Sequence, residues 1–240
     1  MPGRRRPSAR RASGRLRPPM KGKRMKNMST VILLSAGALA AAGVAQAQIG
    51  SGWTQRTYTE RLQYHHTGGP NIEQKSPVPS SFSDAYVSYS KSGTLQTFVF
   101  KNTTAGRCEI RVNNDYTSGQ HQFEGYLMFA RPSSTLSDYE GTHVFQDFGA
   151  ATHAAWKMKF NPDGSFHSEH NTLVTNAYGK TYRVNFVHNM GSHTITVYVD
   201  GSKKVDGADE GGSSHYTKYG MYGGHLVGRA TWNNVKHFTK

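Results

Sequence analysis

The chain alternates between polar and apolar residues over many short segments. In residues 194–200 every second position is Ile or Val, and in residues 155–160 Trp, Met and Phe alternate with Lys. Successive side chains of a β-strand point to opposite faces, so this two-residue period predicts strands with one buried face. No long segment repeats its apolar residues at the 3.6-residue period of a helix. The pattern therefore predicts an all-β chain.

Weaker alternation predicts further strands at residues 95–102, 107–114, 122–129, 143–149, 181–188, 216–224 and 229–238. Turn-forming residues separate several of them, as at Asn161-Pro162-Asp163-Gly164 and Asp200-Gly201. Many short strands joined by polar turns are typical of an antiparallel jelly-roll β-sandwich. Residues 48–85 are less regular and predict a leading segment that wraps the sandwich.

The first 47 residues have the pattern of a secretory signal peptide. A basic stretch precedes the apolar run Val31–Ala42, which ends in the small-residue cleavage pattern Ala45-Gln46-Ala47. The basic stretch is long, which is compatible with a translation start at Met20, Met25 or Met28. Because the apolar run is short for a bilayer span, a membrane anchor is only the alternative. We expect an extracellular or periplasmic protein that is free of the membrane after cleavage.

Charge and cysteine content narrow the class of function. The whole chain carries a net charge of +14, but the first 47 residues hold 11 of the 29 Lys and Arg and no acid, which leaves 18 basic and 15 acidic residues, a balance of +3. This balance lacks the basic excess of a nucleic-acid-binding surface, and it suits an acidic polysaccharide as the partner. The single cysteine, Cys108, excludes an internal disulfide and is expected in the core. We expect residues 48–240 to form one monomeric domain held together by packing.

The segment 216–224 combines aromatic and basic residues on one strand face. Tyr216, Lys218 and Tyr222 share that face with Gly220. Lysine is rarely buried, so we expect the face to be exposed, with two phenols beside an ammonium group. Such a surface can hold a sugar polymer, and a tyrosine on it can transfer protons.

A charged segment near the middle of the chain alternates in the same way. Arg107, Glu109 and Arg111 line one face of it, opposite Cys108 and Ile110. A guanidinium presents a planar pair of donors that fits a carboxylate. The segment therefore fits either a salt-bridged exposed strand or a surface that binds substrate carboxylates.

Three polar residues on other predicted strands are further candidates. Gln122 and Glu124 share a polar face opposite Phe123. Gln146 lies within an otherwise apolar strand, where a buried amide needs a hydrogen-bond partner. It is therefore either a structural hydrogen-bonding group or a donor to a substrate carboxyl.

Together these segments resemble the jelly-roll polysaccharide lyases. R-x-E-x-R at residues 107–111, a Gln-centred strand at 143–149 and Y-x-K-x-G-x-Y at 216–222 occur in the order found in the alginate lyases and the related glucuronan lyases. The resemblance extends over residues 95–238. It implies a secreted enzyme that cleaves a 4-linked polyuronate by β-elimination, endo-acting and without a required cofactor.

The resemblance also implies a concave groove for substrate and roles for individual residues. Arg111 and Gln146 would neutralise the substrate carboxylate, and Tyr222 would transfer the C5 proton. The substrate-binding candidates are Arg107, Glu109, Gln122, Glu124, Tyr216 and Lys218. The alginate lyases carry Gln-x-His on the middle strand, whereas this chain has Phe148 at the third position. His121 is the candidate replacement if a bulge turns it away from the core.

Two other classes of function stay open. A glycoside hydrolase needs two carboxylic acids that flank the bond, and Glu109 and Glu124 could form such a pair only if their strands lie together. A non-catalytic carbohydrate-binding domain would need only the aromatic and polar face. No His or Cys cluster has metal-ligand spacing, so no metal site is predicted, although a structural calcium ion held by loop carbonyls is compatible with the sequence. The remaining histidines, among them His65 and His215, are expected at the surface or in loops.

Overall fold

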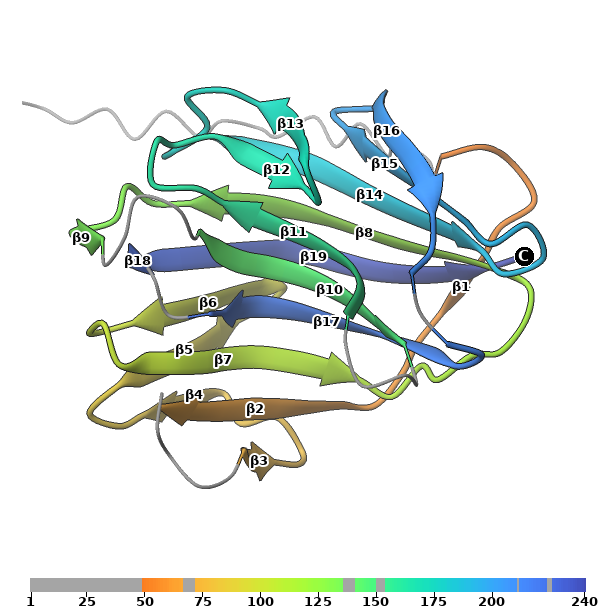
Figure 1. Ribbon diagram of the computed structural model, residues 1–240. Coiled ribbons are helices and arrows are strands. Elements are labelled where there is room, and N and C mark those ends of the chain that lie inside the picture. Colours follow the sequence, from red (N-terminus) through yellow and green to blue (C-terminus); the bar gives the residue numbers. More distant parts are fainter. Residues whose placement is uncertain (1–48, 67–71, 136–140, 150–153, 211, 224–225) are drawn as a thin grey trace, which may run out of the picture. The chain divides into compact units, whose positions relative to one another are not determined.

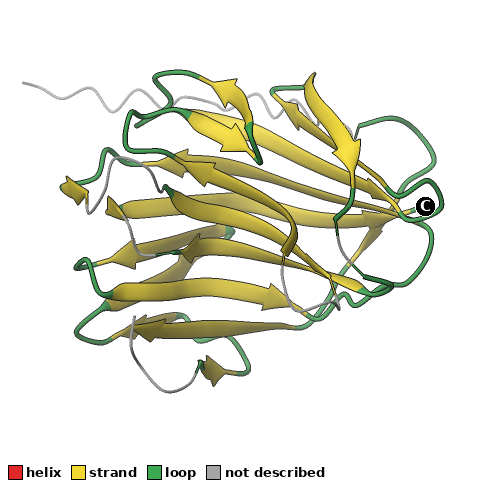
Figure 2. Ribbon diagram, viewed as in Figure 1, coloured by secondary structure: helices red, strands yellow, loops and turns green. Residues whose placement is uncertain are grey.

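The computed structural model describes residues 49–66, 72–135, 141–149, 154–210, 212–223 and 226–240 (Figure 1). All described residues belong to one compact unit, Ala45–Lys240. The expected signal peptide therefore lies outside the described residues. Strands and turns account for the described part of the chain (Figure 2), and no apolar helix of membrane-spanning length occurs in it.

Two antiparallel sheets and one short strand pair make up the fold (Figure 1). Sheet A has the order β16 (Ser202–Ala208), β15 (Thr194–Val199), β14 (Thr181–Asn189), β8 (Gln120–Phe129), β19 (Arg229–Thr239), β6 (Leu95–Phe100), β5 (Val87–Ser92) and β4 (Ser81–Ser83), with β1 (Thr54–Arg56) beside β19. Sheet B has the order β13 (Asn171–Val174), β12 (Phe166–Ser168), β11 (Ala154–Phe160), β10 (Thr142–Gly149), β17 (His215–Tyr222), β7 (Ala105–Val112), β2 (Glu60–His66) and β3 (Glu73–Lys75). The short pair is β9 (Ser134–Thr135) with β18 (Leu226–Val227). This arrangement confirms the predicted antiparallel jelly-roll sandwich.

The core lies between the two sheets, where aromatic rings from both meet. The ring of Phe123 on β8 has its centroid 4.8 Å from that of Phe145 on β10 and 5.6 Å from that of Tyr219 on β17. Cys108 is fully buried on the same side of β7, as its parity predicts. Burying a side chain of this size stabilises the fold by about 1.5–3 kcal/mol, so these contacts fix which face of each strand turns inward.

The alternation of the sequence locates most strands within a few residues. The predicted strand at 107–114 is β7, and the one at 143–149 is β10. The prediction for residues 48–85 is wrong in one respect. This segment does not only wrap the sandwich, because its strand β2 pairs with β7 and is an inner strand of sheet B.

Candidate functional site

The outward face of sheet B carries a row of basic and amide side chains. Lys218 on β17 is paired in register with Gln146 on β10 and with Arg111 on β7. Arg111 is paired in turn with Arg61 on β2. The inward residues next to them in sequence, such as Tyr219, belong to the core. These four residues therefore cross four neighbouring strands on the side away from sheet A.

A second row of side chains crosses the same strands at the C-terminal end of β17. Tyr222 is paired with His143 on β10 and with Arg107 on β7, and Arg107 is paired with His65 on β2. Glu109 lies on β7 between the two rows. The strands thus place Arg111, Gln146 and Tyr222, which are far apart in the sequence, on one face.

The carboxylate of Glu109 is the centre of this face. It accepts a hydrogen bond of 2.9 Å from Nε2 of Gln146 and lies 2.5 Å from Nη1 of Arg107 and 3.3 Å from Nζ of Lys218. Each of these four residues is at most 8% exposed. The expectation that Lys218 is exposed is wrong, because the partners around Glu109 allow the ammonium group to be buried. Burial lowers the pKa of Lys218, and the charge of Glu109 offsets part of that shift.

Gly220 is required by the close approach of β7 and β17 at Glu109. Its φ of 137° lies in the region that favours glycine. A Cβ atom at this position would lie 2.6 Å from Cα of Glu109 and 2.7 Å from the carbonyl oxygen of Cys108. The glycine of Y-x-K-x-G-x-Y therefore allows the charged centre to form.

Each tyrosine of this face lies under a different arginine. The guanidinium of Arg107 is 4.6 Å from the ring centroid of Tyr222, and that of Arg111 is 4.0 Å from the ring centroid of Tyr216. Arg111 also donates to Asn113 and Asp115, at 2.6 Å in each case. Burial raises the pKa of Tyr216, although the positive charge of Arg111 opposes that shift. Both phenols remain partly exposed.

Phe148 lies at the position where the resemblance implies a histidine. Its ring stacks on Tyr216 with centroids 5.2 Å apart, and Nζ of Lys218 lies 4.8 Å from its centroid. The side chain lies on the same outward face as Gln146, two residues away on β10. It provides an apolar contact at this point and cannot transfer a proton.

A pocket of about 120 Å³ adjoins the Tyr222 end of the face. It is lined by His143, Lys157, Lys159, Glu169 and His170. Lys157 is paired with Gln146, and Lys159 with His143, so the two lysines continue both rows onto β11. The pocket extends the basic surface beyond β10.

Three predicted site residues do not reach this face. Gln122, Glu124 and His121 all lie on β8 of sheet A, whereas Gln146 lies on sheet B. Glu124 accepts a hydrogen bond of 2.9 Å from Asn185 within its own sheet. The predicted substrate-binding roles of Gln122 and Glu124 are therefore not supported by their positions, and Glu109 and Glu124 are not placed to flank one glycosidic bond.

His121 does not take the place of the missing histidine. Its ring stacks on Tyr116 with centroids 3.6 Å apart, and its Nε2 lies 2.8 Å from the carbonyl oxygen of Ser118. Burial lowers the pKa of His121. Because it shares the inward parity of Phe123 and no bulge reverses it, it is directed between the sheets.

The structure adds residues that the sequence interpretation missed. Arg61, Gln63 and His65 of β2 join the outward face, and their alternation with Leu62 and Tyr64 is the signal that could have revealed them.

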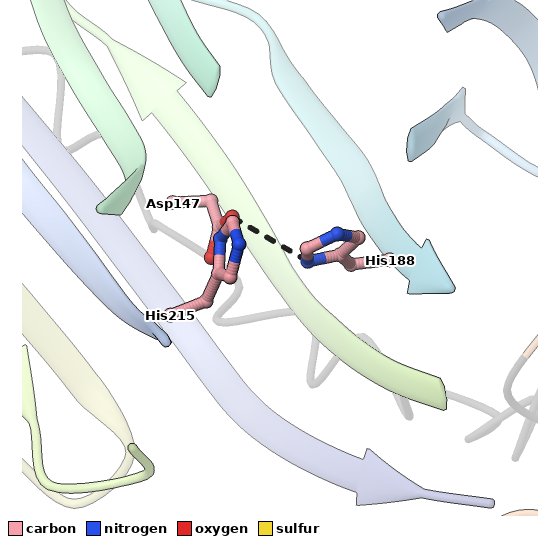
Figure 3. Close-up of side chains that lie close together, drawn as sticks. All are labelled: Asp147, His188 and His215. Atoms are coloured by element: carbon pink, nitrogen blue, oxygen red, sulfur yellow. Dashed lines mark hydrogen bonds and ion pairs between the residues drawn. The ribbon is translucent and has the colours of Figure 1, made fainter. Parts of the chain in front are cut away.

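A polar cluster inside the sandwich was also missed. Asp147, His188 and His215 are fully buried and lie together between the sheets (Figure 3). They come from three strands that are far apart in the sequence, so no local sequence motif predicts the cluster. The expectation that His215 lies at the surface is wrong, because its parity on β17 turns it inward.

Comparison with solved structures identifies the class of fold. The alginate lyase AlyC3 has a TM-score of 0.61 at 14% identity, over 76% of this chain and 91% of that chain. The alginate lyase AlyA1 from Zobellia galactanivorans, of polysaccharide lyase family 7, has a TM-score of 0.57 at 17% identity, over 76% and 96%. The alginate lyase from Corynebacterium sp. has a TM-score of 0.58 at 16% identity, over 75% and 94%. The chain therefore has the jelly-roll fold of the family 7 alginate lyases, as its motifs predict.

Sequence similarity identifies the family. The chain is 32% identical to the citrate-binding protein of Hevea brasiliensis over 180 residues, which cover 69% of this chain and 72% of that protein. It belongs to the family of this citrate-binding protein. No model of a protein family matches the chain.

Proposed function

We propose that the chain is a polysaccharide lyase that cleaves a 4-linked polyuronate, of the alginate or glucuronan type, by β-elimination. The observation that carries this proposal is the position of Arg111, Gln146 and Tyr222 on one face of sheet B. The fold of the alginate lyases supports it. The protein would act as a secreted monomer on internal bonds of an acidic polysaccharide, and the reaction would require no cofactor.

The first chemical requirement is neutralisation of the uronate carboxylate. The C5 proton is poorly acidic while the adjacent carboxylate keeps its full charge. Arg111, Lys218 and Gln146 lie in one row, and together they offer two cations and an amide to that group and to the enolate-like transition state. Preorganised donors of this kind typically contribute about 10²–10³ in rate each.

The second requirement is a group that moves protons at C5 and at the leaving oxygen. Tyr222 is partly exposed and lies in the second row of the face, between His143 and Arg107. The guanidinium of Arg107 over its ring would stabilise negative charge that develops on the phenol oxygen. Tyr222 would take the C5 proton and return a proton to the 4-linked oxygen as that bond breaks.

The basic surface beyond the tyrosine suits a polymer of uronates rather than a single sugar. Lys157 and Lys159 line the pocket next to His143, whose ring centroid is 5.8 Å from that of Tyr222. A neighbouring uronate of the same chain would place its carboxylate against these ammonium groups.

A second candidate function is carboxylate binding without cleavage. It is favoured by Phe148, which removes one proton-transfer group from the face, and by the citrate-binding protein of the same family. In this case the row Gln146, Lys218 and Arg111 would hold the carboxylates of a small polycarboxylate or of an intact polymer.

One set of assays separates the two candidates. The purified chain is incubated with alginate, glucuronan and citrate; ultraviolet absorbance reports new C4–C5 double bonds, and calorimetry reports binding. The lyase is supported if wild type forms unsaturated product and Tyr222→Phe lowers the rate of its formation at least about 100-fold. The control Tyr198→Phe, on sheet A, should keep the wild-type rate. Binding without product supports the second candidate. Normal turnover by Tyr222→Phe would remove this tyrosine from the mechanism.

A further inference from the structure

The buried cluster between the sheets has the composition of a metal site. Asp147 of β10, His188 of β14 and His215 of β17 each offer a ligand atom, and these atoms lie within 4.8 Å of one another. Nδ1 of His215 is 2.7 Å from Oδ2 of Asp147, and Nδ1 of His188 is 3.5 Å from the same oxygen (Figure 3). All three residues are completely buried. The same nitrogen of both imidazoles therefore faces one carboxylate.

The other nitrogen of each ring is held from outside the cluster. Nε2 of His188 lies 2.9 Å from Oδ2 of Asp209, and Nε2 of His215 lies 3.2 Å from the carbonyl oxygen of Gly212. A carbonyl and an ionised carboxylate can only accept, so both Nε2 atoms must carry the proton. Metal-binding histidines usually have this arrangement, in which an outer acceptor fixes the tautomer and leaves the inner nitrogen free to coordinate.

The cluster has fewer protons than its close contacts need when both imidazoles are neutral. If both rings are neutral, both Nδ1 atoms carry lone pairs, and the contact between His215 and Asp147 has no proton. The hydroxyl of Tyr116 lies 2.8 Å from Asp147 and 2.9 Å from Nδ1 of His188, and its single proton serves one of them. While Asp147 is ionised, all contacts are satisfied only when both imidazoles are doubly protonated, which places two further positive charges in the interior. One divalent cation would supply the same charge and leave both rings neutral.

We propose that Asp147, His188 and His215 bind one divalent transition-metal ion, with Zn²⁺ as the best match and the hydroxyl oxygen of Tyr116 next to the fourth position. Two imidazoles and one carboxylate suit zinc, whereas calcium prefers oxygen ligands alone. In a tetrahedral site with bonds near 2.1 Å the ligand atoms lie about 3.4 Å apart. The distance of 3.5 Å between Nδ1 of His188 and Oδ2 of Asp147 matches this value. The distance of 2.7 Å between Nδ1 of His215 and the same oxygen would have to increase when the ion binds. The sequence interpretation predicted no metal site, because these ligands meet only through the fold.

The expected role of the ion is structural. It would join β10 and β17 of sheet B to β14 of sheet A, directly beneath Gln146 and Tyr216, which are the chain neighbours of Asp147 and His215. Such a cross-link would support a sandwich that has no disulfide. The inference does not depend on the proposed lyase activity.

The test uses the full chain, stripped of metal with a chelator and then titrated with Zn²⁺. We expect about one Zn²⁺ per chain to survive desalting, and a rise in Tm of roughly 5 °C or more that the chelator reverses. Ca²⁺ at the same concentration should leave Tm unchanged. His188→Asn and His215→Asn should each lower Zn²⁺ affinity at least about 10-fold, whereas His170→Asn, at an exposed position outside the cluster, should retain it.

Spectroscopy keeps the test decisive if the histidine variants do not fold. Co²⁺ bound to the wild-type chain should give the intense visible absorption of a tetrahedral site. The proposal is overturned if wild type retains no Zn²⁺ and shows no change in Tm, if Co²⁺ gives only the weak spectrum of an octahedral surface ion, or if folded His188→Asn and His215→Asn bind Zn²⁺ like wild type.

Discussion

Nε2 of Gln146 donates a hydrogen bond of 2.9 Å to the carboxylate of Glu109, although their strands are not neighbours. β17 lies between β10 and β7, and the bond crosses it beside Gly220, which has no side chain to block the way. Glu109 therefore orients the amide of Gln146 as well as pairing with Arg107 and Lys218. It is a positioning residue for the proposed carboxylate site.

Replacing Glu109 tests this central role. Glu109→Gln would leave the buried charges of Arg107 and Lys218 without their partner, and we expect the free energy of unfolding to fall by about 3 kcal/mol. Urea denaturation measures the change. Asp206→Asn, which breaks an exposed ion pair with Lys203, is the control and should have little effect. Equal effects of the two substitutions would mean that Glu109 is not a structural centre.

Gly220→Ala should destabilise the fold more than a positive φ alone explains. The added methyl group would meet backbone atoms of Glu109 and Cys108 at 2.6–2.7 Å, so we expect a loss of about 3 kcal/mol or more. Gly179→Ala separates the two causes, because Gly179 also has a positive φ, of 73°, but open space around it. That control should cost about 1–2 kcal/mol. Similar losses in both variants would contradict the close approach of β7 and β17.

Phe148→His introduces the proton-transfer group that the resemblance to the alginate lyases implies at this position. If the face supports elimination, we expect turnover of polyuronate to rise at least about 10-fold, measured as the rate of formation of unsaturated ends. Phe148→Gln provides a polar side chain that cannot act as a base and should give no gain. An equal gain in both variants would show that polarity, and not proton transfer, limits the reaction.

His237 should make the stability of the protein depend on pH in a defined range. Its ring lies among aromatic side chains, 5.5 Å from Phe123 and 5.6 Å from Tyr58 between centroids, and burial lowers the pKa of His237 to about 4. An unfolded histidine has a pKa near 6.5. Between these values the unfolded chain binds a proton that the folded chain does not, so stability falls as pH drops from about 6.5 to about 4 and is not affected further below that.

The matched measurement compares wild type with His237→Phe by urea denaturation across this pH range. Wild type should lose about 3 kcal/mol more than the variant between pH 6.5 and 4. His170→Gln, at an exposed position, should follow wild type. Parallel pH profiles of wild type and His237→Phe would show that folding does not lower the pKa of His237.

The sequence predicts where the strands of this fold lie along the chain better than it predicts which strands pair with one another. Alternation locates β7, β10 and β17, because the inward face of each must be apolar to join the core. That Arg111, Gln146 and Tyr222 share a face is implied by the resemblance to the jelly-roll polysaccharide lyases and not by alternation, and the register confirms it.

Residues that depend on contacts between distant strands could not be placed in this way. Gln122 and Glu124 have the parity expected of polar face residues, but no local signal says that β8 belongs to the opposite sheet. Likewise, His188 and His215 are separated by 27 positions and by the gap between the sheets, so their shared contact with Asp147 appears only in three dimensions.

The position of Glu109 has a consequence for any acidic ligand. Arg107 and Lys218 already pair with the carboxylate of Glu109, so a ligand carboxylate that binds them would have to displace Glu109. Much of the electrostatic gain then cancels between two similar ion pairs. Selectivity must come from what an internal glutamate cannot offer, such as a second and third acidic group on the same molecule that reach the lysines of β11. If the proposed carboxylate site is correct, we expect polyanions to bind more tightly than simple monocarboxylates.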